Sequence, residues 1–277
     1  MIVVTGATGN VGRTLVQALT AAGEQVTAVS RRASDVPEGV RHQRADLAEP
    51  ERLRSVLDGA DALFLLIAGS GENLNPPDIL DVAKAGGVRR VVLLSSQGAG
   101  TRPEAYSHSH LRAFEDAVQQ SGLDWTVLRP GGFDSNAFLW AEMVRSQRTV
   151  AAPFGDVALP FIDPADIAEV AAVALRDGTH AGRTYELTGP APISPREQAQ
   201  AIADALETPV RFVEQSRDEA RAQLLQFMPE PVVDGTLTIL GEPSAAEQRV
   251  SPDVEQTLGR PPRTFAQWAV RNIAAFR

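Results

Sequence analysis

A glycine-rich turn close to the start of the chain constrains the fold more than any other feature of the sequence. Residues 2–4 are apolar, residues 5–12 read TGATGNVG, and apolar residues then recur at helical spacing until residue 22. This order predicts a buried strand, a tight turn and an amphipathic helix. The backbone of such a turn can approach a phosphate closely, and the N–H groups at the helix start then face the phosphate oxygens. The sequence therefore predicts a strand–turn–helix unit that binds a dinucleotide.

The glycines of this turn are spaced G-x-x-G-x-x-G, which differs from the G-x-G-x-x-G of the usual dinucleotide-binding motif. The preceding strand and the following helix supply the context that the motif requires. The alternative is a tight turn of the same shape that binds no ligand. If the dinucleotide is bound, we expect its contacts to come from Gly6, Thr8, Gly9, Asn10, Val11 and Gly12.

The end of the second predicted strand indicates which dinucleotide is bound. Sites that select NAD place an acidic residue there, which binds the ribose 2′-hydroxyl. This chain has Arg31 and Arg32 instead, and a guanidinium group pairs well with a 2′-phosphate. We therefore predict NADP(H) as the cofactor; the alternative is a pair of solvated arginines. Asp46 and Leu47 follow a presumed third strand and are expected to hold the adenine, although Asp46 is equally suited to cap the next helix.

The first half of the chain alternates apolar segments with helical patterns. We predict buried strands at residues 2–4, 26–29, 62–67, 91–94 and 126–128. Helices are predicted between them, at residues 11–22, 51–57, 78–85 and 111–120. Strands that alternate with helices form a parallel sheet covered on both faces, and right-handed crossovers make such a sheet doubly wound. The expected fold class is α/β, of the Rossmann type.

The alternation weakens after residue 132. We predict short strands at residues 161–162 and 185–187, a further candidate strand at 210–213, and helices at 164–175, 194–206 and 218–227. The expected cofactor-binding domain spans residues 1–150, and strands around 161–188 join its sheet. A smaller C-terminal region at residues 189–277 is expected to cap a substrate cleft.

The composition excludes several classes of partner and site. The formal net charge is −9, which disfavours contact with nucleic acid phosphates. No apolar run reaches the length of about 18 residues that a membrane span needs. The N-terminus has no signal-peptide pattern, so the cytoplasm is the expected compartment. Cysteine is absent, which excludes disulfides and thiolate metal sites, and Lys84 is the single lysine of the chain.

Several further motifs make the chain resemble a known family. They are Ser95-Ser96 after the strand at 91–94, LRPGGF at residues 128–133, FIDPADIA at 161–168 and YELTGP at 185–190. With the glycine turn, they make the chain resemble the atypical short-chain dehydrogenase/reductases, and within these the NmrA-like, NAD(P)H-binding group. The resemblance covers nearly the whole chain and implies a Rossmann fold with a bound nicotinamide dinucleotide. We also expect Ala68 and Ser95 to contact the cofactor.

The resemblance implies a catalytic triad, which this chain only partly retains. Short-chain dehydrogenases usually have a serine, a tyrosine and a lysine four residues after the tyrosine. Ser96 matches the serine, and Tyr106 is the only tyrosine nearby, but His110 stands at the lysine position. A second register places Ser107 and Leu111 at the tyrosine and lysine positions.

Neither register supplies a lysine. Lys84 is expected on a helix that returns away from the carboxyl ends of the strands, where the cofactor sits. The polar candidates for catalysis are Ser96, Tyr106, His108 and His110, and the alternative for the last three is a surface loop with solvated side chains. A metal site is not expected, because His108 and His110 have no evident third ligand.

The substrate pocket is expected beside the nicotinamide, lined by Gln97, Gly132, Phe133, Asn136, Phe138 and Trp140. Ordinary core packing is the alternative for the aromatic residues. The leading functional hypothesis is an NADPH-dependent oxidoreductase that transfers hydride to a small quinone, enone or other electron-poor carbonyl substrate. The alternative is a non-catalytic NADP(H) sensor that regulates a partner protein. Epimerase chemistry is disfavoured, because that branch of the family normally keeps tyrosine and lysine. A homodimer is a possible assembly.

Overall fold

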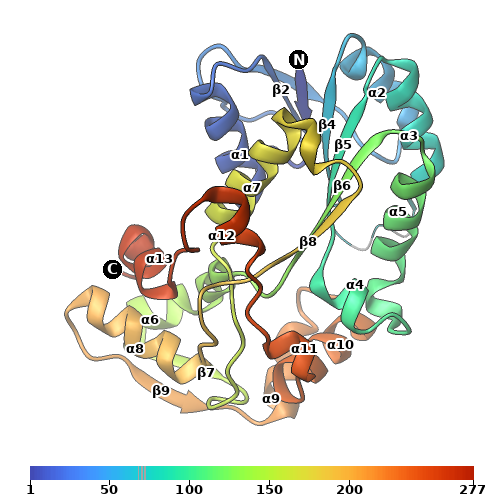
Figure 1. Cartoon of the computed structure of the whole chain (residues 1–277). Helices are drawn as coiled ribbons and strands as arrows, with labels where there is room; N and C mark the ends of the chain where they lie inside the picture. The colour runs from blue at the N-terminus through green and yellow to red at the C-terminus, as the bar shows by residue number, and fades with distance from the viewer. Residues whose placement is uncertain (68, 70, 72) are drawn as a thin grey trace.

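The computed structural model describes residues 1–67, 69, 71 and 73–277. Within these residues, seven parallel strands form one sheet in the order β3-β2-β1-β4-β5-β6-β8 (Figure 1). The strands are β1 (Ile2–Val4), β2 (Val26–Ser30), β3 (Arg41–Arg44), β4 (Ala62–Leu66), β5 (Arg90–Leu94), β6 (Asp124–Pro130) and β8 (Arg183–Leu187). The strand order reverses between β1 and β4, which confirms the predicted Rossmann-type, doubly wound α/β fold.

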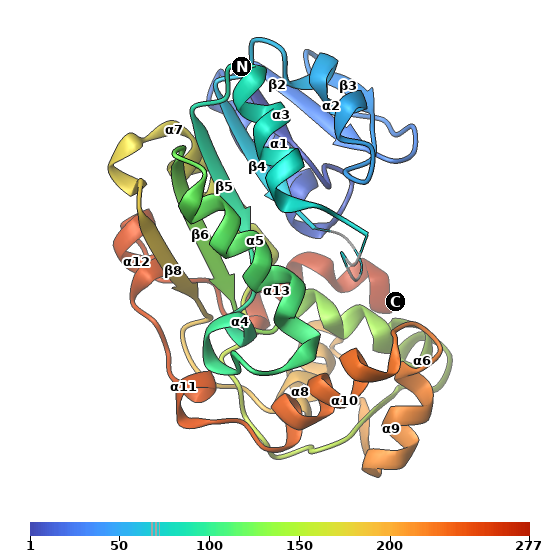
Figure 2. The ribbon, with the colours of Figure 1, turned by 90° about the vertical axis from the view of Figure 1, so that its right-hand side faces the viewer.

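Helices cover both faces of this sheet, as Figures 1 and 2 show. One face carries α1 (Asn10–Ala21) and α7 (Pro164–Arg176), and the other carries α2 (Pro50–Leu57), α3 (Pro76–Ala85) and α5 (Ser109–Gln120). Successive residues of β4 serve opposite faces: Phe64 packs into the core under α1 and α7, whereas Leu63 and Leu65 pack under the other three helices. Strands buried on both faces explain why the sequence shows continuous apolar runs here.

One predicted strand is wrong. Residues 161–162 form only an isolated bridge, in which Ile162 pairs with Phe133. The segment is short because Pro160 precedes it and Asp163 already caps α7. Of the segments around 161–188, only β8 joins the large sheet, where it pairs with β6.

A smaller region lies beyond the carboxyl ends of the strands (Figure 1). Its two-stranded sheet pairs β7 (Thr149–Ala152) with β9 (Arg211–Glu214) in parallel. The sequence places residues 149–150 at the end of the cofactor-binding domain, whereas this pairing puts them in the smaller region. The helices around it are α6 (Ala141–Gln147), α8 (Pro195–Leu206) and α13 (Phe265–Asn272). Their core centres on Trp268, which is 2% exposed and contacts the rings of Phe265 and Phe276.

The described residues also form α9 (Arg217–Leu224), α10 (Glu230–Gly241), α11 (Ala245–Gln248) and α12 (Asp253–Leu258). The pair α9 and α10 has a small core of its own, built on Ala220, Val233 and Leu237. α12 returns to the large sheet and packs on α7 and β8. There Asp253 accepts a hydrogen bond from the Glu186 N–H at the edge of the sheet (2.7 Å). The C-terminal segment therefore contacts both parts of the molecule.

Buried ion pairs at the start of α7 join the two parts. Asp163, at the N-cap of α7, pairs with Arg271 of α13. Asp166, which is fully buried, accepts hydrogen bonds from Arg260 Nη2 and from the Arg263 N–H, both at 2.7 Å. Removing one partner of such a pair leaves an uncompensated buried charge, which typically costs about 3–5 kcal/mol.

Asp134 is a third buried carboxyl group in this area, and it differs from the other two. It is 1% exposed, and neither of its oxygens has a hydrogen-bond partner among the described residues. Burial raises the pKa of Asp134 to about 8, the neighbouring carboxylates Asp163 and Asp166 add to the shift, and Arg271 opposes it. Asp134 is therefore mostly protonated at neutral pH.

We predict that Asp134→Asn stabilises the protein in a pH-dependent way. The folded state keeps the proton of Asp134 up to about pH 8, while the unfolded state loses it near pH 4. The wild type therefore loses stability as the pH rises between these values, at up to about 1.4 kcal/mol per pH unit, and the variant does not. Urea unfolding at pH 5, 6.5 and 8 should show an advantage for the variant that grows by about 2 kcal/mol or more. Asp163→Asn, which removes an ion pair, should destabilise at every pH. Parallel curves for wild type and Asp134→Asn would contradict the assignment.

Candidate active site

The glycines of the β1–α1 turn have different tasks. Gly6 has a positive φ of 62°, which favours glycine. A Cβ on Gly12 would overlap the Gly6 carbonyl oxygen, so the helix and the turn lie too close together for a side chain at this position. Gly9 is the N-cap of α1, has extended backbone, and a Cβ there would lie 3.4 Å from that same oxygen. Gly6 and Gly12 therefore shape the turn, and Gly9 keeps the space in front of the helix N-terminus open.

A cavity of about 570 Å³ opens in front of this turn. Its lining comes from the turn, the end of β2 and the segments after β3 and β4: Thr5, Gly6, Thr8, Gly9, Val29, Ser30, Arg31, Ala45, Asp46, Leu47, Ala48, Leu66, Gly69, Gly71, Asn73 and Leu74. This volume is within the usual range for small-molecule and cofactor sites. The helix N-terminus and the free backbone N–H groups at its rim suit a pyrophosphate.

Six residues predicted to bind the cofactor line this cavity: Gly6, Thr8, Gly9, Arg31, Asp46 and Leu47. Asn10, Val11 and Gly12 lie in α1 behind the turn, Arg32 is exposed outside the lining, and Ala68 lies outside the described residues. Asp46 does not cap α2, because Glu49 is the N-cap; its Oδ1 accepts a hydrogen bond from the Ala48 N–H (3.1 Å).

The cavity has a positively charged edge at the ends of β2 and β3. Ser30 Oγ lies 2.8 Å from His42 Nε2 and donates to the Arg32 carbonyl (2.6 Å), which fixes the strand end. Arg44 Nε donates to the Arg31 carbonyl (3.0 Å), which places a second arginine beside the one that lines the cavity. Sequence reasoning missed Arg44, because β3 is polar and shows no strand pattern. This edge can pair with the 2′-phosphate of NADP(H).

The structure packs His108 against the short helix that Ser96 caps. Ser96 is the N-cap of the short helix α4 (Gln97–Thr101), where its Oγ accepts from the Gly98 N–H (3.2 Å). His108 belongs to the 3-10 turn η1 (Tyr106–His108), and its Nδ1 lies 3.0 Å from Ser107 Oγ. A Cβ on Gly98 would clash with the His108 imidazole, so the ring packs directly on α4. Burial, and to a smaller extent His110, lower the pKa of His108, so its ring is neutral at pH 7.

His110 and Tyr106 point in different directions. The His110 ring lies 2.9 Å from the place that a Cβ on Gly71 would occupy, and Gly71 lines the cavity. His110 therefore reaches the cavity rim from the first turn of α5. Tyr106 is 62% exposed. Of the two members of the expected Tyr–x–x–x–Lys register, the one at the lysine position is nearer to the cofactor cavity.

Ser95 belongs to a buried network that sequence reasoning missed. Its Oγ donates to Glu115 Oε1 (2.5 Å), and Glu115 accepts two further hydrogen bonds from Arg129 Nε (3.0 Å) and Nη2 (2.6 Å). The hydrogen-bond donor of the Ser95 side chain is thus already used inside the protein. The sequence signal for this network was Glu115, a charged residue on the side of α5 that faces the core.

The residues predicted to line the substrate pocket divide into two groups. Gln97 is buried, and its Oε1 lies 3.6 Å from the place of a Cβ on Gly131. Gln97, Gly132, Phe133 and Asn136 flank the carboxyl ends of β5 and β6. Trp140 instead packs against the core of the smaller region, and Phe138 lies on that core, 37% exposed. Phe138 contacts Trp268, with 5.0 Å between the ring centroids.

A hydrogen bond connects the start of α1 to the segment after β6, which contains residues predicted to line the substrate pocket. Asn10 Nδ2, at the start of α1, donates to Ser135 Oγ (3.0 Å).

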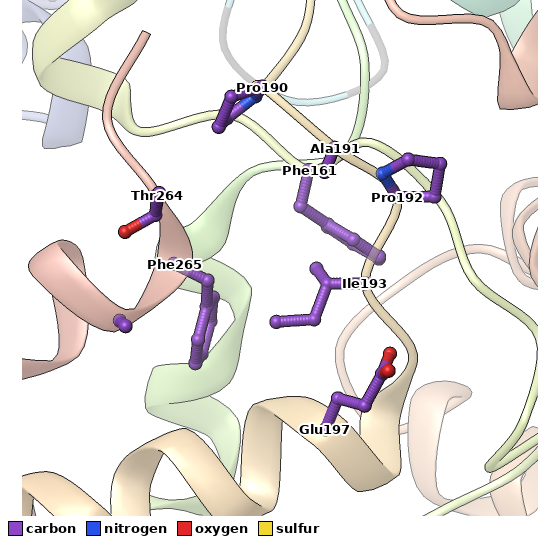
Figure 3. Close-up of a pocket in the computed structure, with 9 residues that line it drawn as sticks. Phe161, Pro190, Ala191, Pro192, Ile193, Glu197, Thr264 and Phe265 are labelled. Atoms are coloured by element: carbon purple, nitrogen blue, oxygen red, sulfur yellow. The ribbon is translucent and has the colours of Figure 1, made fainter.

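A second, smaller cavity of about 240 Å³ lies in the smaller region (Figure 3). Phe161, residues 190–193, Glu197 and residues 264–266 line it. Glu197 is engaged in capping α8, since it accepts a hydrogen bond from the Ser194 N–H (2.8 Å). The lining is otherwise largely apolar. Phe161 also packs on Gly132, where a Cβ would lie 2.6 Å from the Phe161 ring. The smaller cavity therefore adjoins the residues that are predicted to line the substrate pocket.

The described residues contain neither a metal-binding cluster nor a membrane-spanning helix. No group of three or more His, Cys, Asp or Glu side chains among them could hold a metal ion. None of the helices in this part of the chain combines the length and apolar character that a membrane crossing requires.

Comparison with known proteins gives consistent matches. A family model described as NAD(P)H-binding matches residues 6–178. The chain is 36% identical to (4-alkanoyl-5-oxo-2,5-dihydrofuran-3-yl)methyl phosphate reductase of Streptomyces griseus subsp. griseus, over 100% of this chain and 99% of that protein. It is 32% identical to NAD(P)H azoreductase of Xenophilus azovorans, over 100% of this chain and 99% of that protein. The Escherichia coli NADPH-dependent quinone oxidoreductase QOR2, solved with NADPH, shares the fold with a TM-score of 0.81 at 23% identity, over 98% of this chain and 99% of that chain.

We predict that Gly9→Val and Gly12→Val separate binding from folding. At Gly9 a side chain has room in the protein but enters the space in front of the helix N-terminus. We expect a thermal midpoint within a few degrees of wild type and NADPH binding too weak to measure by calorimetry. At Gly12 the side chain meets the backbone of the turn, so we expect loss of folded protein. Normal NADPH binding by Gly9→Val would show that the site is misplaced.

We predict that Arg31 sets the preference for NADPH. A hydrogen bond to a charged group contributes about 1.5–3 kcal/mol, so Arg31→Ala should weaken NADPH binding by about 10- to 150-fold. NADH binding should stay nearly constant, because NADH lacks the 2′-phosphate. Arg32→Ala is the matched control, since Arg32 does not line the cavity, and should change either affinity by less than about threefold. Equal affinity of the wild type for both cofactors would refute the assignment.

Proposed function

The chain belongs to the NAD(P)H-binding family whose model matches residues 6–178, and from this premise we propose that it is an NADPH-dependent reductase of small, electron-poor acceptors. The observation that carries the proposal is the juxtaposition of two features. The cavity of the β1–α1 turn has an arginine edge at one end, and His110 lies beside Gly71 at its rim. One ligand can therefore contact the turn, the arginines and the candidate proton donors.

Bound NADPH would supply the hydride, and the protein would supply position and a proton. The helix N-terminus at Gly9 would hold the pyrophosphate and Arg31 the 2′-phosphate. The segment after β6, tied to the turn through Asn10 and Ser135, would form the floor on which the acceptor lies. Ser96 caps α4, and the His108 ring packs on the backbone of the same helix.

The proton donor decides which acceptors can be reduced. Lys84 cannot assist, because it lies in α3, where it pairs with Asp81 (2.9 Å) and bonds the Ser121 carbonyl. Hydride transfer to a plain ketone creates an alkoxide, a strong base that needs a proton at once. Transfer to a quinone or an enone spreads the charge into a phenolate or enolate, which is a far weaker base. A site that relies on positioning and on hydrogen bonds from histidine, without a tuned acid, is suited to the second class, because a phenolate or enolate can take its proton from water.

The names of the two relatives support the same class of acceptor. The Streptomyces relative is named for a 5-oxo-2,5-dihydrofuran that carries an alkanoyl group, which is a conjugated carbonyl compound. The Xenophilus relative is named an azoreductase. Both acceptors accommodate hydride by delocalising negative charge.

We predict that the wild type oxidises NADPH with quinones, enones or azo compounds, and that aliphatic ketones have a kcat/KM at least about 100-fold lower, which is the typical contribution of a tuned general acid. His110→Ala and His108→Ala should lower kcat by about 10-fold or more, and Tyr106→Phe by less, because Tyr106 is largely exposed. Lys84→Ala is the control and should have no effect.

Two results would overturn this proposal. Aliphatic ketones as the best acceptors would refute the chemical argument. If no acceptor were reduced although NADPH bound tightly, the protein would be a sensor of NADP(H) rather than an enzyme.

A further inference from the structure

Three side chains on three different elements form one buried polar network. Ser95 follows β5, Glu115 lies in the middle of α5, and Arg129 lies in β6. Glu115 is 3% exposed, and its carboxylate receives all three hydrogen bonds described above, from Ser95 Oγ at 2.5 Å and from Arg129 at 2.6 and 3.0 Å. The two bonds from Arg129 are bidentate and so fix direction as well as distance. The hydrogen bonds to Glu115 raise the pKa of Arg129 further, so the guanidinium group is charged at every working pH.

The same guanidinium group also supports α4. A Cβ on Gly100 would clash with Arg129 Nη1, so the guanidinium packs directly against the backbone of this short helix. Ser96, the residue after Ser95, is the N-cap of α4, and the His108 ring packs against Gly98 of this helix. One ion pair, with Ser95, therefore contacts the ends of β5 and β6 and the helices α4 and α5.

The catalytic candidates on α5 depend on the same contact. His110 lies five residues before Glu115 in one continuous helix, which places it about 7.5 Å further along the axis. A helix moves as a rigid body over this length, so the anchor at Glu115 determines where His110 stands relative to Gly71 and to Ser96.

Stability alone does not explain why charged groups occupy this place. Replacing a buried ion pair by well-packed apolar side chains is often neutral or stabilising. Apolar groups, however, tolerate sliding and rotation, whereas a bidentate pair with a third donor defines one geometry. The network therefore suits a part of the protein that must be placed accurately.

We propose that Glu115, held by Arg129 and Ser95, is a positioning residue that fixes α5, and with it His110 beside the cofactor cavity, relative to Ser96 and to the His108 ring packed on α4. This inference rests on the proposed reductase function. Glu115 does not touch the reactants; it acts through the segments that it joins.

The test compares wild type with Glu115→Gln, Arg129→Lys and the milder Ser95→Ala, which leaves the ion pair intact. We expect kcat for the best acceptor to fall about 10- to 100-fold in the first two variants and about threefold in Ser95→Ala. The NADPH dissociation constant and KM should change less than about threefold, because the cofactor cavity is not altered. The solvent deuterium isotope effect on kcat should rise, since proton delivery becomes slower than in the wild type; a purely structural role would leave it unchanged.

Glu169→Gln is the matched control. Glu169 lies in α7 on the opposite face of the sheet and pairs with Arg260 (2.5 Å) and Arg263 (2.6 Å). Its loss should lower the melting temperature without changing kcat or the isotope effect.

The outcomes separate this inference from the function on which it rests. A wild type that reduces no acceptor overturns both proposals. An active wild type whose folded Glu115→Gln and Ser95→Ala variants keep kcat and the isotope effect overturns the positioning role alone. If Glu115→Gln fails to fold, Ser95→Ala still decides the question, because it removes one donor and no charge.

Discussion

The absence of a side chain at Gly12 lets α1 lie close to the Gly6 carbonyl at the end of β1. With α1 in this place, its N-terminus faces the cavity and its apolar side packs on α7. α7 in turn starts at Asp163 and Asp166, whose ion pairs hold the C-terminal segment. The placement of α1, α7 and α13 relative to one another thus depends on the two glycines of the turn, Gly6 and Gly12, which have no side chain. The cavity exists because the helix is close, and the smaller region is docked because α7 lies beside that helix.

The sequence was sufficient for the elements whose burial follows their order along the chain. β1, β4 and β5 are continuous apolar runs, since both of their faces are covered, and each was predicted within about a residue or two. β3 was only presumed, because its residues RHQR form an edge strand with one neighbour and little burial. The expected strand at residues 161–162 was wrong because its apolar pair packs on one bridge instead of a ladder. α4 and α10 contain glycines that weaken a helical pattern and are stabilised by tertiary contacts.

The same distinction separates the parts of the candidate site. The place of Gly9 and Arg31 in the cavity lining was predictable, because each lies at the end of a local element. Arg129 could be located at the end of a strand, but its pairing with Glu115 and Ser95 could not. Asp134 lies about 30 residues from the carboxylates that face it, and nothing near it in the sequence indicates a buried acid. Local pattern reports where a residue lies along an element, whereas its protonation state and its partners depend on the elements that pack around it.

The two edges of the large sheet are closed in different ways. β3 presents Arg41 and Arg44 along an outer strand with low burial, and like charges on an edge oppose pairing with the same strand of another molecule. At β8, α12 covers the other edge, and Asp253 already accepts the hydrogen of an edge N–H. With one border charged and the other covered, neither edge of the large sheet favours the addition of a strand. A partially unfolded molecule that lost α12 would expose the β8 border, where another chain could pair and begin aggregation.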